Sequence, residues 1–285
     1  MIAKKIILGS ANVNSLYGLP KNNIKASEFC SLMNFAFKKG VKIIDTSPVY
    51  GNSEKIIGKS VKKFYVISKI PKIPQNIKNV DLEDWIKKIF FNSKEKMKKQ
   101  IYGILIQNAE ILLSDKADIV YGTLLNLKKE HAIEKIGISI YNFKTLELVI
   151  KKFAIDFVQL PYNILDQRFS KKKIIKILKK NKIEVHARSI FLQGLLTNNK
   201  INLPKKLSKL ENGLKKWRQW IKEKNINPAH ACVDFVLRNK NIDKLVIGFN
   251  SKNNFADIIK FKKTKLNFNN LKIKISQNLL DPRGW

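Results

Sequence analysis

The sequence predicts an α/β protein that folds as a single (β/α)8 barrel, the TIM-barrel architecture. Short apolar runs alternate with longer amphipathic stretches eight times along the chain. The length of 285 residues suits one barrel of about 250 residues better than two small domains. An open, doubly wound sheet is the alternative, but no Gly-x-Gly-x-x-Gly motif of a Rossmann cofactor site follows any apolar run.

The eight apolar runs are the expected strands. In chain order they are expected at residues 6–9, 41–45, 64–68, 102–106, 135–139, 156–159, 183–187 and 244–248. Helix starts are expected between them, with Asp81 as the cap of one helix and Asn227, followed by Pro228, as the cap of another. No repeat, linker or composition shift divides the chain, so we expect one domain over residues 1–285.

The charge is strongly basic, with a formal net charge of +34. Such a charge can indicate a nucleic-acid partner. Here all but five of the 56 basic residues are lysine, and the lysines are spread over every expected helix without an interleaved aromatic cluster. This favours a biased composition over a specific nucleic-acid site, although salt-sensitive binding of nucleic acid stays an alternative.

The cysteines, the histidines and the hydropathy of the chain bear on disulfide bonds, metal sites and membrane spans, respectively. Cys30 and Cys232 are too few for a disulfide framework, and His131, His186 and His230 do not cluster, so we expect no metal site. His186 lies within an expected strand, and we expect it in the barrel interior or core. No window approaches the ~20 apolar residues of a membrane span, so we expect a cytoplasmic protein.

Residues 41–58, VKIIDTSPVYGNSEKIIG, are the most informative stretch for function. An apolar strand there ends on Asp45, Tyr50 follows five positions later, and the next expected strand ends beside Lys69. A free tyrosine has a pKa of about 10, roughly three units too high for proton transfer at neutral pH, so it needs a nearby cation held by a carboxylate. Asp45, Tyr50 and Lys69 are therefore candidates for proton-transfer chemistry at the barrel mouth.

The string DTSPVYGNSEKIIG resembles the second-strand signature of the aldo-keto reductases. Similar matches recur in the expected order: VISK, GILIQNAE, IGIS, DFVQLPYN, ARSIFLQGLL and VIGFNS. SIFLQGLL and the tail DPRGW are also similar to bacterial members associated with surface-polysaccharide biosynthesis. The resemblance covers nearly the whole chain and implies an NAD(P)H-dependent oxidoreductase that reduces an aldehyde, ketone or sugar-derived carbonyl.

In this family a hydride passes from the cofactor to the carbonyl carbon while a tyrosine protonates the oxygen. The resemblance makes Tyr50 this proton donor, Lys69 the cation that lowers its pKa, and Asp45 the group that keeps Lys69 charged. The family usually has a histidine at the end of strand four, where this chain has Gln107. Glutamine can donate a hydrogen bond to a carbonyl but cannot relay a proton. Gln107 therefore leaves an alternative open, a cofactor-binding regulatory protein with weakened catalysis.

The resemblance also implies cofactor contacts. Ser139 and Gln159 match positions that hydrogen-bond the nicotinamide carboxamide, and Arg188 matches a side chain that stacks on the nicotinamide ring. The loop after strand seven and the segment after strand eight match the rest of the dinucleotide site, through Ser189, Phe191, Leu192, Gln193, Gly194, Gly248, Asn250, Ser251 and Asn254. NADP, as NADPH, is the expected cofactor and NAD is possible, because many members have a basic residue where Asn250 lies and Lys252 is only two positions away.

The expected partner is a small-molecule carbonyl substrate. Tyr17, in the loop after the first strand, and Trp285 at the end of the chain are candidates for its pocket. In the family the C-terminal segment folds over the barrel mouth, which here corresponds to residues 261–285. The sequence leaves the physiological substrate and the oligomeric state open.

Overall fold

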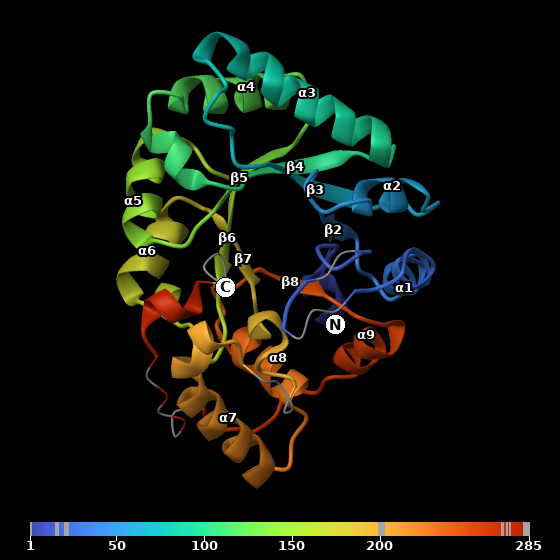
Figure 1. Cartoon of the computed structure of the whole chain (residues 1–285), viewed down its shortest axis with the longest axis vertical. Coiled ribbons are helices and arrows are strands. Elements are labelled where there is room, and N and C mark those ends of the chain that lie inside the picture. The colour runs from blue at the N-terminus through green and yellow to red at the C-terminus, as the bar shows by residue number, and fades with distance from the viewer. Residues whose placement is uncertain are drawn as a thin grey trace.

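Eight parallel strands close into one barrel in chain order in the computed structural model, which confirms the expected architecture (Figure 1). Residues 2–14, 17–19, 23–198, 203–268, 271, 273 and 275–281 are described. The last strand pairs with the first through Ile6 and Leu245. The strands are β1 (Ile6–Gly9), β2 (Ile43–Asp45), β3 (Tyr65–Ile70), β4 (Ile101–Ile106), β5 (Lys135–Ser139), β6 (Phe157–Pro161), β7 (Glu184–Arg188) and β8 (Lys244–Gly248).

The helices form a ring around the barrel, as Figure 1 shows. Each strand is followed by at least one helix, and two helices, α7 and α8, separate β7 from β8. In chain order the helices are α1 (Ala26–Lys38), α2 (Ser53–Gly58), α3 (Asn79–Met97), α4 (Ala117–Lys129), α5 (Phe143–Lys152), α6 (Lys172–Lys180), α7 (Glu211–Glu223), α8 (Pro228–Arg238) and α9 (Lys252–Ile259). Within the described part of the chain, no helix is both long and apolar enough to span a membrane.

The element boundaries lie within two residues of the expected ones for every strand, with differences at the helix starts. The expectation that Asp81 caps a helix is wrong: α3 begins at Asn79 with Lys78 in the cap position, and Asp81 lies in the first turn. An acidic side chain there is still favourable because it faces the positive end of the helix dipole. The expectation for Asn227 is confirmed, since its side chain accepts hydrogen bonds from the backbone N–H groups of Ala229 and His230.

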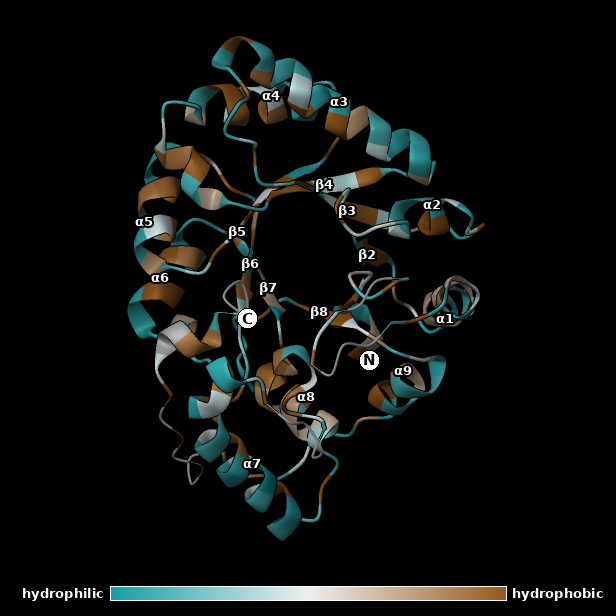
Figure 2. Ribbon diagram, viewed as in Figure 1, coloured by the Kyte–Doolittle hydropathy of each residue, from teal (hydrophilic) through white to brown (hydrophobic). Residues whose placement is uncertain are grey.

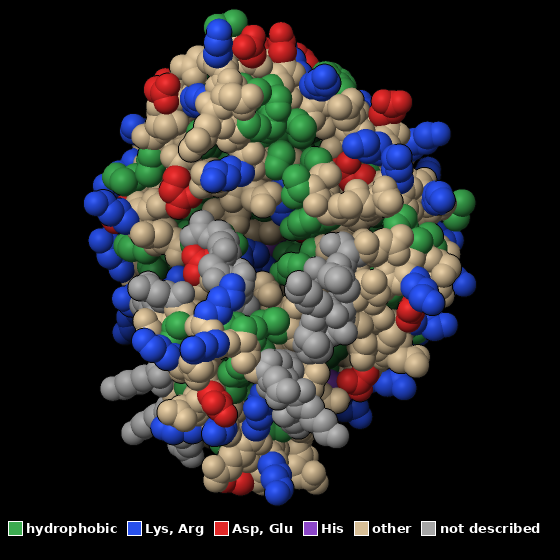
Figure 3. All heavy atoms as spheres, viewed as in Figure 1, with side chains coloured by type: hydrophobic (Ala, Val, Ile, Leu, Met, Phe, Trp, Pro, Cys, Tyr) green, Lys and Arg blue, Asp and Glu red, His purple; other side chains and the backbone are tan. Residues whose placement is uncertain are grey.

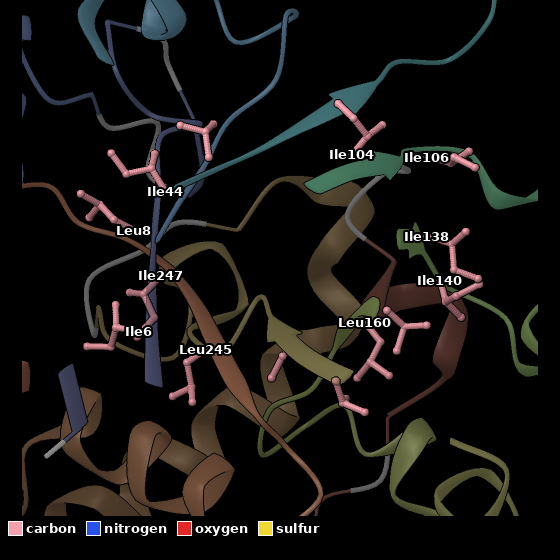
Figure 4. Close-up of a cluster of buried hydrophobic side chains, with 14 of the residues drawn as sticks. Ile6, Leu8, Ile44, Ile104, Ile106, Ile138, Ile140, Leu160, Leu245 and Ile247 are labelled. Carbon is pink, nitrogen blue, oxygen red and sulfur yellow. The ribbon is translucent and has the colours of Figure 1, made fainter. Parts of the chain in front are cut away.

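The main core lies between the barrel and the surrounding helices. Alternate strand residues point outward into this layer, as in β1, where Ile6 and Leu8 are buried against the helices (Figure 4). Figure 2 shows the matching pattern, with hydrophobic residues on the strands and on the barrel-facing sides of the helices. Burial of this layer supplies the main stabilisation of the barrel, because apolar surface leaves water on both sides of the contact.

The barrel interior has its own apolar layer, formed by Ile7, Ile67, Leu105 and Phe157. The Phe157 ring fills the space above Gly137, where an added Cβ would lie 2.4 Å from the ring. His186 is 1% exposed and stacks on Phe157 with ring centres 4.9 Å apart, which confirms that it is an interior residue. This layer closes the barrel below its mouth.

The described part of the C-terminal segment packs on α7 and α8. The Trp220 and Phe268 rings lie 5.4 Å apart, and Arg238 of α8 donates hydrogen bonds to the backbone oxygens of Thr264 and Leu266. A second apolar cluster is buried between these elements. That residues 261–285 cover the barrel mouth stays a prediction, and Trp285 lies outside the described residues.

Candidate active site

A cavity of about 410 Å³ opens at the carboxyl ends of the strands. This is the end at which barrel proteins gather their functional groups, because the loops that follow the strands meet there. All but three of the predicted catalytic and cofactor-binding residues line the cavity; the exceptions are Leu192, Ser251 and Asn254.

Asp45, Lys69 and Tyr50 converge at one wall of this cavity. Lys69 Nζ donates a hydrogen bond to Asp45 Oδ1 at 2.5 Å and another to the backbone oxygen of Thr46 at 2.8 Å. The same Nζ lies 4.8 Å from the centre of the Tyr50 ring. The side chains of Lys69 and Asp45 are each 6% exposed, so the ion pair is shielded from water.

The ammonium of Lys69 is held in its charged form. Burial is the largest single effect and by itself lowers the pKa of Lys69, but the Asp45 carboxylate and the Tyr50 phenol together more than offset it. The net result is that the pKa of Lys69 is raised from its usual value. A permanent cation therefore lies beside the Tyr50 phenol.

The sequence between β2 and α2 explains how Tyr50 is presented. The backbone N–H of Tyr50 donates to the backbone oxygen of Ser47 at 3.0 Å, and the backbone oxygen of Tyr50 accepts from the backbone N–H of Ser53 at 3.1 Å. The hydroxyls of Thr46 and Ser53 lie 3.1 Å apart across the turn and are hydrogen-bonded. The turn is therefore fixed at both ends, which limits the positions that the Tyr50 ring can take.

Glu54, in the first turn of α2, also holds the segment between β2 and α2 in place. It is 3% exposed, and its carboxylate accepts a hydrogen bond from Ser68, the residue before Lys69 in β3. Burial raises the pKa of Glu54, while Ser93, Lys96 and Ser68 oppose this effect. Glu54 thus ties the start of α2 to the strand that carries Lys69.

Gln159 and Ser139 line the cavity from adjacent strands, where they are paired in register. Gln159 Nε2 donates a hydrogen bond to Asp45 Oδ2 at 2.6 Å. Because that amide nitrogen is engaged, the Gln159 oxygen is the group left to accept a hydrogen bond from a ligand amide. Gln107 also lines the cavity, and its buried side-chain oxygen has no hydrogen-bond partner in the described part of the chain.

The loop after β7 has an unusual backbone. Ser189, Leu192, Gln193 and Gly194 all have positive φ values, between 47° and 98°. Non-glycine residues seldom adopt this conformation, and such strain is common where a loop is held to fit a ligand. Leu19, from the loop after β1, donates a hydrogen bond to the Gln193 oxygen at 2.7 Å. A Cβ at Gly194 would lie 2.7 Å from the Leu19 oxygen, so the two loops meet over the cavity at a position that requires glycine.

The segment after β8 is fixed by Asn12. Its side-chain nitrogen donates to the Phe249 backbone oxygen at 3.1 Å and to Asn250 Oδ1 at 2.9 Å. Its own side-chain oxygen is buried and has no partner among the residues that the structure describes. Ser251 caps α9: its hydroxyl accepts from the backbone N–H of Asn254 at 3.1 Å and donates to Asn254 Oδ1 at 3.0 Å, so both side chains serve the helix start. The side chain of Leu192 is buried in the apolar cluster beside α7.

The cavity residues that sequence reasoning missed include Asn12 and Tyr141. Tyr141 follows β5 by two residues, and its ring lies 4.1 Å from Arg188 Cζ. A polar or aromatic residue just after a predicted strand was the available signal in both cases. Tyr17, which was predicted, does line the cavity.

The family model of the aldo/keto reductases, "Aldo/keto reductase family", matches residues 5–273. The chain belongs to the aldo/keto reductase family. It is an oxidoreductase of the class that uses NAD(P)H to reduce carbonyl groups. Comparison with curated proteins gives no match.

Solved structures show the same fold at low sequence identity. The holo form of the aldo-keto reductase AKR11C1 from Bacillus halodurans is 16% identical with a TM-score of 0.75, and 95% of this chain aligns with 93% of that chain. The glycerol dehydrogenase AKR11B4 from Gluconobacter oxydans is 18% identical with a TM-score of 0.69, and 94% of this chain aligns with 90% of that chain.

The cavity of this aldo/keto reductase fits a nicotinamide cofactor. Within the described part of the chain, buried polar atoms of the lining residues Asn12 and Gln107 have no hydrogen-bond partner, and native proteins seldom leave such atoms unpaired. Gly9 and Gly248 leave the wall between β1 and β8 free of side chains. Among the described residues, no group of three or more histidine, cysteine or acidic side chains is arranged to hold a metal ion. Lys and Arg side chains are spread over the visible surface (Figure 3).

Proposed function

We propose that this protein reduces the carbonyl group of a small aldehyde, ketone or sugar-derived molecule, with Tyr50 as the proton donor. The observation that carries the proposal is the convergence of Tyr50, Lys69 and Asp45 on one wall of the cavity. A bound NAD(P)H would supply the hydride. The chain itself supplies the proton and the surroundings in which it moves.

The proton transfer follows from the charges at this wall. As the carbonyl oxygen gains negative charge, the Tyr50 hydroxyl gives it a proton, and the phenolate that remains faces the ammonium of Lys69. Asp45 balances that ammonium, so the Lys69–Asp45 pair carries no net charge before the reaction. Gln107 would donate a hydrogen bond to the same carbonyl oxygen from its amide nitrogen. The oxygen therefore has a proton donor and an orienting donor, both from the chain.

The cofactor would be held by the residues that surround this wall. The Gln159 oxygen and the Ser139 hydroxyl would orient the nicotinamide carboxamide, and the loop after β7 would follow the pyrophosphate. We propose NADPH as the cofactor, with NADH possible. Lys252 is the basic residue closest in sequence to Asn250, and its Nζ lies 5.9 Å from the Phe35 ring, outside the cavity lining. Titration with both cofactors tests the preference: Lys252→Ala should weaken NADPH binding and leave NADH binding unchanged.

Gln107 supports a second candidate, a cofactor-binding regulatory protein with weak catalysis. Its amide takes the position where the family usually has histidine, so no side chain there can relay a proton. Steady-state oxidation of NADPH with a panel of aldehydes separates the two candidates. Turnover that falls about 10²-fold or more in Gln107→Leu supports the enzyme. Tight NADPH binding with no oxidation by any aldehyde supports the regulatory protein instead.

A further inference from the structure

The charged residues that line the cavity differ in whether they have a partner of opposite charge. Three lining residues carry formal charge: Asp45, Lys69 and Arg188. The first two neutralise each other in a buried ion pair. Arg188 has no acidic partner within the described part of the chain. Among the described residues, the cavity lining therefore has one excess positive charge, at the end of β7.

The guanidinium of Arg188 has unused hydrogen-bonding capacity. Among the described residues, its Nη1 reaches only the Ser189 hydroxyl, at 3.4 Å, and its Nη2 is buried without a hydrogen-bond partner. A buried donor on a charged group is costly when it is left unpaired. The planar edge of a guanidinium matches the two oxygens of a carboxylate or phosphate, and such pairs are among the stronger hydrogen bonds in proteins.

The aromatic residues around Arg188 fix its orientation. The Tyr141 ring centre lies 4.1 Å from Cζ, so one face of the guanidinium is covered, and Arg188 still lines the cavity. Tyr17 lines the same cavity from the loop after β1. Tyr17 is 45% exposed, so a ligand in the cavity can reach its side chain.

We propose that Arg188, together with the Tyr17 hydroxyl, binds an anionic group of the substrate, so that the preferred substrates are aldehydes or ketones that carry a carboxylate or phosphate. This proposal rests on the carbonyl reduction proposed above and names its substrate class. The anion would bind across the cavity from Tyr50, with the carbonyl between them. Arg188 thereby differs from the role expected from the sequence, a stack on the nicotinamide ring.

The net positive charge of the protein also attracts anions, and this effect differs from local binding at Arg188. A chain with a net charge of +34 attracts any anion to some extent. Arg218, on α7, offers a matched control, because it does not line the cavity and its removal costs the same charge. The comparison of Arg188→Met with Arg218→Met isolates the effect of position.

Two matched pairs of substrates test the proposal with the full chain and NADPH. Succinic semialdehyde against butanal tests a carboxylate, and glyceraldehyde 3-phosphate against glyceraldehyde tests a phosphate. We expect kcat/KM to favour the anionic member of at least one pair by about 10- to 100-fold, the range for a hydrogen-bonded charge pair. Arg188→Met should remove most of that preference, and Arg218→Met should retain it. The pair with the larger preference identifies the anion.

A binding measurement keeps this inference separate from the proposed function. Calorimetry with 4-hydroxybutyrate and 1-butanol, on the NADP complex, needs no turnover. If Arg188→Met loses 4-hydroxybutyrate binding and Arg218→Met keeps it, the anion site is supported even when no aldehyde is reduced. In that case only the proposed function fails. The anion site is overturned if Arg188→Met leaves the substrate preference and the 4-hydroxybutyrate affinity unchanged, or if NADPH affinity falls by the same factor as they do.

Discussion

Gln159 on β6 donates a hydrogen bond to the carboxylate oxygen of Asp45 that Lys69 does not use, with Nε2 and Oδ2 2.6 Å apart. Both side chains are buried, with 2% and 4% of the residue exposed. Asp45 is thus held from two sides, and its direction relative to Lys69 depends on an amide that lies 114 residues later in the chain.

Replacing this amide should weaken catalysis. In Gln159→Leu the Asp45 carboxylate loses one charge-assisted hydrogen bond, so we expect kcat to fall about tenfold or more. Kinetics under saturating NADPH measure the effect apart from any loss of cofactor affinity. Gln100→Leu is the matched control, since Gln100 pairs with Glu134 at the surface. Unchanged kcat in Gln159→Leu would show that this contact does not position Asp45 for the reaction.

The buried ion pair should affect stability and activity differently. Lys69→Met leaves the Asp45 carboxylate buried without its cation, so we expect the free energy of unfolding to fall by about 3–5 kcal/mol. The double variant Asp45→Asn/Lys69→Met removes both charges and should regain most of this loss. Urea unfolding measures both variants. Activity should be absent from both, and a double variant as unstable as Lys69→Met would contradict the electrostatic explanation.

Glu184 predicts an acid-dependent loss of stability. Burial by itself raises the pKa of Glu184, but His186 and Lys135 outweigh it and lower the pKa to about 2 from the usual 4.5. A carboxyl whose pKa is lower in the native state than in the unfolded chain stabilises the fold when the pH is above its unfolded-state pKa. This stabilisation is lost as the pH falls from about 4.5 towards 2. Urea unfolding at pH 7 and pH 3 should therefore show a stability difference between wild type and Glu184→Gln that shrinks at pH 3. Glu95→Gln, at an exposed site, should show no such change.

The floor of the barrel gives a packing test with an internal control. Gly137→Ala would place a Cβ 2.4 Å from the Phe157 ring, so we expect a loss of about 1–3 kcal/mol in the free energy of unfolding. In Gly122→Ala, within α4, the added Cβ meets nothing within 4 Å, and we expect a gain of about 0.5–1 kcal/mol. Equal effects in the two variants would contradict the packing described for the barrel interior.

The barrel was predictable because each strand is an apolar run bounded by polar or turn residues. β1 and β5 were placed to the residue, whereas the expected strand at 156–159 continues in the structure to Pro161. The start of α3 was misplaced because helix ends also depend on packing against neighbouring elements, which local capping signals do not report.

The site was predictable where its residues end strands, and less so where loops determine direction. Lys69 and Gln159 lie on strands, so their inward direction follows from the alternation of β residues. Asn12 and Tyr141 lie in loops, and no periodicity indicates where they point. The contact between Leu19 and Gln193 joins segments that are far apart in the chain, and no local sequence pattern reports it.

The most direct test of the account is a single-turnover experiment on Tyr50→Phe. The protein is loaded with NADPH and mixed with 4-nitrobenzaldehyde, and the loss of NADPH fluorescence is followed in wild type, Tyr50→Phe and the control Tyr121→Phe, whose hydroxyl binds the Ala154 oxygen at the surface. We predict oxidation in wild type and Tyr121→Phe, and none in Tyr50→Phe although it still binds NADPH. Oxidation by Tyr50→Phe at the wild-type rate would contradict the assignment of Tyr50 as the proton donor.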